Sequence, residues 1–446
     1  MTTKSLISGL AMLALVCSAQ RGVTAADNSQ KKKPPAPATY TITQLDAGAN
    51  VASSGQLISD NQVVAGNLQG GSLFAFAWSA QSGFVVLTLG GGGSLVSGIS
   101  ANGIVSGAAD TPDGTEVLGF IWTPANGLVT IGDLGGGYTV PQSVNSRGVV
   151  IGDAITAAGP DHAFMWTEAG GMVDLDPTGL DDSAARFVTE DGSLIIGSIY
   201  SETGQRIFAW TKTTGLTDIG SLGRDMLPEI MNRQGALAGT VQREDGTEGT
   251  FFWSQANGLE DIGSLGGDEI RPTAMNDAGT IVGFGTTASG ETHGFVWSKA
   301  NGLVDLGTLG GDFSWASDIN SSGLVTGYSK TARGHDHAIA WTADGGVIDL
   351  GTLGGSGSRG QFVTEAGAII GISGVKGHQT HAFVWTEAGG MVEMPSLGPF
   401  EIVDAASRTG AFTGFTLDKK SNGLHAVLWA PTTQSPSVAP SSRGSQ

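Results

Sequence analysis

The sequence predicts an all-β fold, a β-propeller of about nine four-stranded blades. Nine tryptophans recur at intervals of 43 or 44 residues, at positions 78, 122, 166, 210, 253, 297, 341, 385 and 429. Each interval holds four short apolar runs separated by glycine-containing turns, which is typical of a propeller blade. After the first 25 residues no helical pattern of appreciable length follows. A β-helix, which needs a shorter coil than this repeat provides, is the less favoured alternative.

One full unit illustrates the predicted strands. We expect strand a at residues 303–309, strand b at 314–319, strand c at 324–328 and strand d at 337–341. Asn320 begins the turn between b and c because its side chain can bond its own backbone, and a glycine three residues later supplies a positive φ. The same turn is expected at 145–148, 232–235 and 276–279, and with Thr or Ser in place of Asn at 189–192, 364–367 and 407–410.

The two ends of the repeat array predict a closed ring. The repetitive part, residues 40–430, opens on a lone strand a at 40–45 and finishes on a strand d at 425–429. If each blade runs b–c–d–a, the last blade lacks its strand a, and the N-terminal strand would complete it. Small residues in strand b, such as Ser314 and Ala316, suit a crowded strand beside the channel. Closure would also remove two exposed sheet edges.

The repeated tryptophan is predicted to be a core residue and not a ligand platform. In strand d, Phe383 and Trp385 share one face, whereas Ala382 and Val384 share the other. Because neighbouring blades cover both faces of a blade, both sets are expected to be buried.

Residues 1–25 are predicted to be a signal peptide. An apolar run at 6–16 follows a lysine and precedes small residues, and it is too short to span a bilayer. Cleavage after Ala19 or Ala25 would suit a signal peptidase. Lipid attachment at Cys17 is less favoured, because Val16 stands where a small residue is needed. We therefore expect a secreted, periplasmic or cell-surface bacterial protein, without membrane insertion after cleavage.

The segments that flank the array are expected to lack a fold of their own. Residues 26–39 are basic and rich in proline and are expected to form a linker, and residues 431–446 are expected to be a disordered Ser/Pro tail. Cys17 is the one cysteine, so the mature chain has no disulfide. The net charge of −19 argues against nucleic acid and anionic membrane as partners.

The residues before the tryptophans resemble a known family. His162-Ala-Phe164 and His381-Ala-Phe383 resemble the signature of the HAF family of extracellular repeat proteins, and the Asp-Leu-Gly-Thr-Leu-Gly-Gly segments at 305–311 and 349–355 agree with it. The units that end at Trp78, Trp122, Trp210 and Trp253 lack the histidine. The resemblance implies an exported bacterial propeller, and it implies no catalytic residues.

Five histidines share one repeat position, which raises the question of a metal site. They are His162, His293, His337, His381 and His425. Equivalent positions in adjacent blades are too far apart for one zinc ion. We expect each histidine to bond a backbone carbonyl at the start of strand d. Two local pairs, His335 with His337 and His378 with His381, are the alternative as transition-metal ligands.

Four aspartates between strands a and b are the more suggestive set. Asp182, Asp225, Asp268 and Asp312 lie 43 or 44 residues apart and are expected on one rim near the channel. Such an arc could hold Ca²⁺ or attract a cationic ligand, although Asp also simply favours turns. Arg271 and Trp315, the one tryptophan outside the repeat, fall in the same segments, and an aromatic ring there could stack on a sugar.

The sequence contains no nucleophile elbow, P-loop, HExxH, calcium-loop or CxxC motif. These observations favour a secreted, non-catalytic module that binds an extracellular glycan or protein through one rim. Two alternatives stay open. The first is a propeller hydrolase or lyase that acts on polysaccharide with rim acids such as Asp268 and Asp312. The second is a cell-surface scaffold without a small-molecule site.

Overall fold

The computed structural model describes residues 39–45, 51–177, 179, 181–202, 204–417 and 423–432. The predicted signal peptide, Cys17, and nearly all of the predicted linker and tail lie outside these residues. The described residues form 36 strands and no α-helix. Accordingly, no described segment is a helix long and apolar enough to cross a membrane.

Each repeat contributes an inner, a second, a third and an outer strand, which correspond to the predicted b, c, d and a. The inner strands are β2 (Ala52–Ile58), β6 (Ser94–Ile99), β10 (Gly135–Val144), β14 (Asp182–Val188), β18 (Arg224–Met231), β22 (Gly266–Met275), β26 (Gly310–Ile319), β30 (Ser358–Val363) and β34 (Glu401–Ala406). The second strands are β3 (Val64–Gln69), β7 (Val105–Asp110), β11 (Val150–Thr156), β15 (Ile195–Ser201), β19 (Leu237–Gln242), β23 (Ile281–Thr287), β27 (Val325–Thr331), β31 (Ile369–Val375) and β35 (Phe412–Leu417). The third strands are β4 (Leu73–Ser79), β8 (Val117–Thr123), β12 (Asp161–Thr167), β16 (Gly204–Thr211), β20 (Glu248–Ser254), β24 (Thr292–Ser298), β28 (Asp336–Thr342), β32 (Gln379–Thr386) and β36 (Leu424–Pro431). The outer strands are β5 (Gly83–Leu87), β9 (Gly127–Thr130), β13 (Gly171–Asp174), β17 (Gly215–Asp218), β21 (Gly258–Asp261), β25 (Gly302–Asp305), β29 (Gly346–Asp349), β33 (Gly390–Glu393) and, from the start of the chain, β1 (Tyr40–Gln44).

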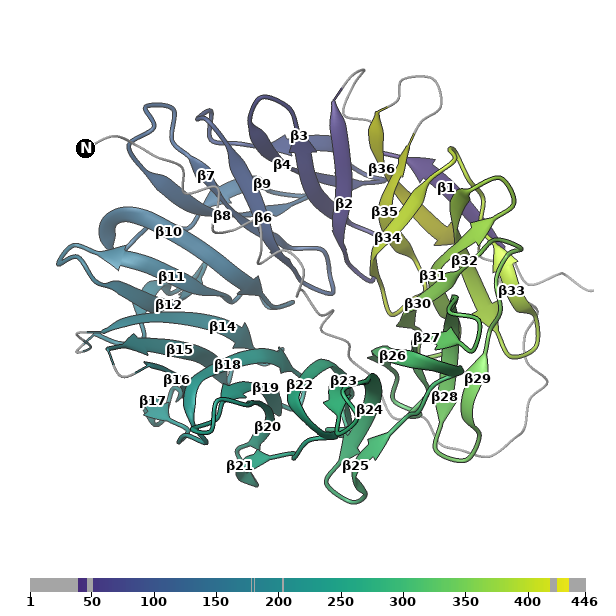
Figure 1. The fold of residues 1–446 in the computed structure, drawn as a ribbon. Coiled ribbons are helices and arrows are strands. Elements are labelled where there is room, and N and C mark those ends of the chain that lie inside the picture. Colours follow the sequence, from purple (N-terminus) through teal and green to yellow (C-terminus); the bar gives the residue numbers. More distant parts are fainter. Residues whose placement is uncertain are drawn as a thin grey trace, which may run out of the picture.

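These strands build the antiparallel sheets of a β-propeller. Within each four-stranded unit, neighbouring strands pair antiparallel in the order inner, second, third, outer. Two pairs of adjacent units are joined into eight-stranded sheets by a single parallel contact each, Tyr138 with Val117 and Thr292 with Phe313. Figure 1 shows the units standing side by side around a common centre, in chain order from β2 to β36. The all-β propeller class predicted from the repeat is therefore confirmed.

The first strand of the chain pairs with the last. β1 lies antiparallel to β36 with Tyr40 opposite Pro431 and Gln44 opposite Val427, so its sheet has the order β1-β36-β35-β34. β2 in turn packs against β34, β35 and β36 (Figure 1). Pro431, predicted as the start of the tail, is thus the last residue of a paired strand. A backbone hydrogen bond of 2.7 Å from Thr432 to Thr39 extends this pairing further.

The outer strands are shorter and the inner strands longer than predicted. β25 ends at Asp305 and β26 begins at Gly310, although we expected these strands to end at 309 and to begin at 314. A carboxylate oxygen of Asp305 accepts a hydrogen bond of 2.7 Å from the amide of Gly307, whose φ is 68°. The aspartate therefore turns the chain at once, since glycine adopts this backbone conformation without strain.

Every inner strand carries a β-bulge at the same repeat position, a feature that the sequence did not predict. The register slips by one residue in each of the nine inner strands. The residue left unpaired is polar in all nine and half-buried: Gln56, Ser97, Gln142, Arg186, Glu229, Thr273, Ser317, Gln361 and Asp404. Since a bulge re-aims a side chain, the bulges place polar groups along the innermost strands.

The core lies between the units, as predicted for the tryptophans. Trp122, Trp166, Trp253, Trp297 and Trp429 are buried, and the other four repeat tryptophans are half-buried at the edge of the same clusters. Phenylalanines two residues earlier in the third strand, such as Phe164 and Phe383, are fully buried. The predicted core role of the repeated aromatic residues is confirmed.

Candidate functional site

Four of the five repeat histidines bond a carboxylate and not the backbone carbonyl that we expected. The Nδ1 atom lies 2.9 Å from a carboxylate oxygen in His162–Asp174, 2.8 Å in His293–Asp305 and 2.9 Å in His337–Asp349, and His381 pairs in the same way with Glu393. The acid follows its histidine by twelve residues and ends the outer strand of the same unit. The carbonyl prediction failed because the outer strand ends earlier than predicted, directly beside the ring.

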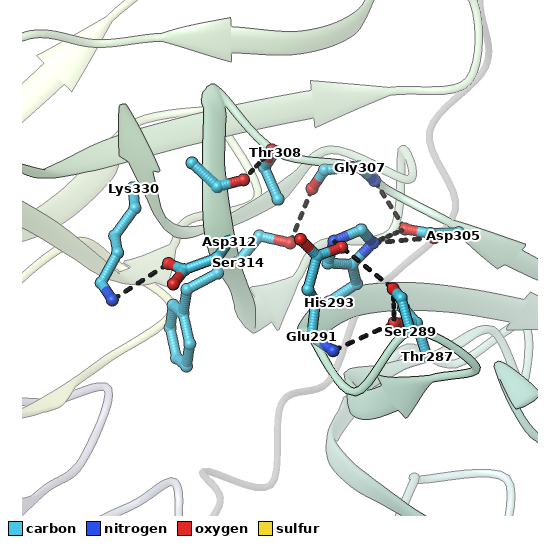
Figure 2. A network of polar contacts seen from close by, with 12 residues as sticks. Thr287, Ser289, Glu291, His293, Asp305, Gly307, Thr308, Asp312, Ser314 and Lys330 are labelled. Carbon is cyan, nitrogen blue, oxygen red and sulfur yellow. Dashed lines mark hydrogen bonds and ion pairs between the residues drawn. The ribbon is translucent and has the colours of Figure 1, made fainter. Parts of the chain in front are cut away.

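In three of the four pairs, those of Asp174, Asp305 and Asp349, the acid also holds the turn into the next unit, as Figure 2 shows for Asp305. Asp305 accepts the amide hydrogen of Gly307, and the carbonyl of Gly307 accepts a bond of 2.6 Å from the Ser314 hydroxyl. The same hydroxyl accepts a bond of 2.9 Å from the amide of Gly294. This chain of bonds ties the third strand of one unit to the inner strand of the next, so it gives His293 and its equivalents a structural role.

The two histidine pairs considered as metal ligands are only partly available. His337 and His381 each give one ring nitrogen to a carboxylate, whereas His335 and His378 are exposed in the preceding turns. Across the described residues, no group of three or more His, Cys, Asp or Glu side chains is placed to hold a metal ion. A transition-metal or Ca²⁺ site therefore remains a prediction.

The four rim aspartates are all exposed but are not equivalent. They lie in the inner strands and not in the turns before them. Asp182 and Asp225 accept backbone amide hydrogens of Asp161 and Gln205, at 2.9 and 3.1 Å, and so tie adjacent units together. Asp268 and Asp312 stand one repeat position earlier, three residues before Arg271 and Trp315. Asp312 forms an ion pair of 3.1 Å with Lys330, which lowers the pKa of its carboxyl.

Trp315 belongs to a stack of aromatic rings that spans two units. The aromatic stack consists of Phe284 on β23, Phe313 and Trp315 on β26, and Tyr328 on β27. The ring centroids of Trp315 and Phe284 are 3.7 Å apart at an interplanar angle of 17°, and Tyr328 is 6.4 Å from Trp315 at 19°. Phe313 lies 5.5 Å from Tyr328. All four rings are half-buried, so this row of parallel rings reaches the surface.

Cations flank the aromatic stack, and each is paired with an acid. The guanidinium carbon of Arg359 lies 4.5 Å from the Tyr328 ring centroid, and Arg359 also bonds Asp336 at 2.7 Å. The amine of Lys330 lies 5.9 Å from the Phe313 centroid and is the partner of Asp312. At the other end, Arg271 is the cross-strand partner of Phe284 and forms ion pairs with Glu248 and Glu269, at 2.5 and 3.1 Å. The stack is therefore lined by charged groups that are largely neutralised.

A half-buried carboxyl stands near Arg271. Glu229 is the bulge residue of β18, and burial raises its pKa to about 7, against the opposing effects of the Thr240 hydroxyl and the Arg271 charge. The Glu248 charge adds to the rise. A general acid usually has a raised pKa of this kind, because it must hold its proton near neutral pH.

The sequence singled out Trp315 and Arg271, but their neighbours were missed. Phe284 and Tyr328 occupy one repeat position in consecutive units, 44 residues apart. That spacing was visible in the sequence. Their stacking with Trp315 was not, because it depends on the register of β26 against β27 and on the packing of adjacent units.

Comparison with known proteins finds distant likenesses among solved structures alone. No family model and no curated protein matches the chain. Among solved structures, the chain is similar to TolB from Acinetobacter baumannii (12% identity, 56% of this chain, TM-score 0.34), and it spans 60% of that chain. It is also similar to the β-propeller domain of the Trilobed protease from Pyrococcus furiosus (13% identity, 68% of this chain and 98% of that chain, TM-score 0.37) and to the WD40 β-propeller domain of Doa1 (16% identity, 64% and 93%, TM-score 0.33).

Proposed function

We propose that the chain is an exported, non-catalytic propeller of nine blades, of the HAF repeat type, that binds a glycan through the aromatic stack. The nine four-stranded units support the blade number, and the pairing of β1 with β36 supports closure of the ring by the N-terminal strand. Export is inferred from residues 1–25 of the sequence alone.

The aromatic stack is the observation that carries the binding proposal. A propeller built only for stability needs apolar residues between its blades, and the repeat tryptophans already supply them. The four rings of the stack belong to two consecutive units and reach the surface. Aromatic faces and edges offer apolar area to the C–H faces of a sugar, while nearby polar groups set its orientation.

The charges beside the stack favour a neutral glycan. Arg271, Lys330 and Arg359 are the three cations there, and each is already paired with a carboxylate within 3.1 Å. An anionic polysaccharide would have to displace these acids and would meet the net charge of −19. Paired guanidinium and carboxylate groups can instead donate to and accept from sugar hydroxyls.

Trp315→Ala is expected to weaken binding to insoluble neutral glucan or chitin by tenfold or more, because the substitution removes the central ring of the stack. The measurement is the depletion of protein from solution over a range of polysaccharide concentrations. Leu227→Ala is the matched control, since Leu227 holds the position of Trp315 in another unit and is 42% exposed. Equal weakening by both substitutions, or retention on alginate alone, would contradict the proposal.

A hydrolase or lyase acting on polysaccharide is the second function that an observation favours. Glu229, with its pKa near 7, and Glu248 lie close to Arg271, which is a combination that acid catalysis of glycoside cleavage could use. If the chain is such an enzyme, it releases reducing ends from a soluble glucan and Glu229→Gln abolishes the release. If neither binding nor release is found, the remaining function is that of a scaffold.

A further inference from the structure

A surface cavity of about 460 Å³, widely open to solvent, lies between the outer parts of two adjacent units, apart from the aromatic stack. Thr211, Thr214, Thr217 and Asp218 line it from β16, β17 and the turn between them, and Trp253 and Gln255 line it from the neighbouring unit. This volume is within the range of small-molecule sites and would accommodate one or two sugar rings.

The lining of the cavity is rich in uncharged hydrogen-bonding groups. The hydroxyls of Thr211 and Thr214 lie 2.8 Å apart and so present one cooperative pair. The Thr217 hydroxyl donates to the carbonyl of Ala209 at 2.8 Å, which leaves its oxygen free to accept. The charge of Asp218 is balanced by Arg206 at 2.8 Å. The cavity therefore offers hydroxyl, amide and indole groups with little net charge.

The other units show that this chemistry is not required by the fold. At the position of Thr217 in the outer strand, six units have a β-branched apolar residue: Val85, Val129, Val173, Val304, Ile348 and Val392. Thr217 faces the small Ala209, as Val85 faces Ala77 and Ile348 faces Ala340, so the hydroxyl and not the partner's size sets this unit apart from those two. Thr43 of β1 is the other threonine at this position and faces the larger Leu428. In this unit a hydroxyl replaces a methyl group at the place where the cavity lies.

We infer that this cavity is a second binding site, which takes a neutral mono- or disaccharide. Apolar area from Trp253 and Ile219, the hydroxyls of three threonines and the Gln255 amide match the alternation of C–H and hydroxyl groups on a sugar. The site lies on the outer circumference, so its ligand does not contact the aromatic stack. The inference goes beyond the proposed function and does not depend on it.

Isothermal titration of the full chain with maltose, cellobiose and N,N′-diacetylchitobiose tests the site. At least one of these probes is expected to bind. Thr217→Phe is expected to weaken that binding by about tenfold or more because the ring fills the cavity, and Thr217→Val by about fivefold because one acceptor is lost. Val304→Phe puts the same ring at the same repeat position of another unit and is expected to leave the affinity unchanged.

Trp315→Ala removes the aromatic stack as a possible site for these probes, and in that background binding at the cavity is expected to remain and to stay sensitive to Thr217→Phe. Three results would overturn the inference. The first is that none of the probes binds at concentrations of about 20 mM. The second is that Thr217→Phe and Val304→Phe have equal effects. The third is that Trp315→Ala removes the binding, which would assign the probe to the stack.

Discussion

Removal of residues 39–45 is expected to abolish the cooperative thermal unfolding of the protein or to lower its Tm by more than any single substitution. Five residues of β1 pair with β36. Leu45 is fully buried against the cluster of Ala426 and Leu428, and its amide bonds the carbonyl of Ala426 at 2.8 Å. Loss of this burial and pairing costs on the order of 5–10 kcal/mol, which is comparable to the whole stability of a typical domain.

Circular dichroism melting curves measure this effect, with a chain that begins at Thr39 as the control that keeps β1. Leu45→Ala serves as a milder variant, and it is expected to lower the free energy of unfolding by about 2–5 kcal/mol. It is also expected to speed amide hydrogen exchange in β36 more than in the third strands of the other units. A truncated chain that melts like the control would show that β1 does not complete the last blade, and the proposed closure would be lost.

Besides β1, other contacts join the first and the last units. The carboxylate of Asp404 on β34 accepts a bond of 2.9 Å from the Ser54 hydroxyl on β2. The Ser53 hydroxyl accepts a bond of 2.9 Å from the amide of Ala426, and Arg408 forms an ion pair with Asp60. Equivalent serine-to-amide bonds join other adjacent units, such as Ser314 to Gly294. The first and last units therefore contact each other through the same type of bond as units that are consecutive in the chain.

The fold was predictable from the sequence because the repeat itself carries the information. Each strand is short and local, turn residues recur at fixed offsets, and nine copies average out the departures of any one unit. The lone strand at 40–45 predicted its own partner, because only one unit lacks a strand. The ends of strands were less predictable, since Asp305 acts through a bond to Gly307 that competes with continuation of the strand.

The candidate site was less predictable because it depends on contacts between units. Their spacing along the chain suggested that four aspartates form one set: Asp182, Asp225, Asp268 and Asp312. The last two stand one position earlier in the repeat than the first two, so the four fall into two pairs with different contacts. The bulge in each inner strand shifts the register at the positions where polar residues stand. A polar residue recurs at the bulge position, but the sequence does not show that this residue is unpaired. A partner such as Phe284 for Trp315 follows only from three-dimensional packing.

The second large effect is expected from two carboxyls at the bulges. Because of them, the free energy of unfolding is expected to be lower at pH 8 than at pH 5. Burial raises the pKa of Glu229 to about 7 and that of Asp404 to about 6, although the hydroxyls of Thr240 and Ser54 oppose the shifts. Burial, aided by the charges of Asp153 and Asp182, raises the pKa of Asp161 to about 7. A carboxyl whose pKa is higher in the folded state binds its proton more tightly there. Its contribution to stability is therefore complete below the unfolded pKa and is lost as the pH rises through the folded pKa.

The sizes of these shifts set the expected effect. A shift of about two pKa units corresponds to roughly 3 kcal/mol for a buried group, so Glu229 and Asp404 together reach about 6 kcal/mol, while half-exposed Asp161 adds less because solvent screens it. In the opposite direction, hydrogen bonds from Thr189 and Ser193 lower the pKa of Asp191 to about 2, and this contribution is lost only as the pH falls below 4. The maximum of stability is thus expected near pH 4.

Melting curves between pH 4 and pH 9 measure this dependence, and the Tm at pH 8 is expected to be about 5–10 °C lower than at pH 5. Glu229→Gln and Asp404→Asn keep the shape of each side chain and remove its charge. Each is expected to raise the Tm at pH 8, to raise it less at pH 5 and to change it little at pH 4. Asp268→Asn, at an exposed aspartate of the rim, is the control and is expected to have little effect at either pH. A Tm that is constant from pH 5 to pH 8, or a Glu229→Gln variant less stable than the parent at pH 8, would show that these carboxyls remain ionised in the folded protein. Glu229 would then lack the raised pKa that favours it as a general acid. The proposed hydrolase or lyase function would lose its main support, and glycan binding would be the better supported proposal.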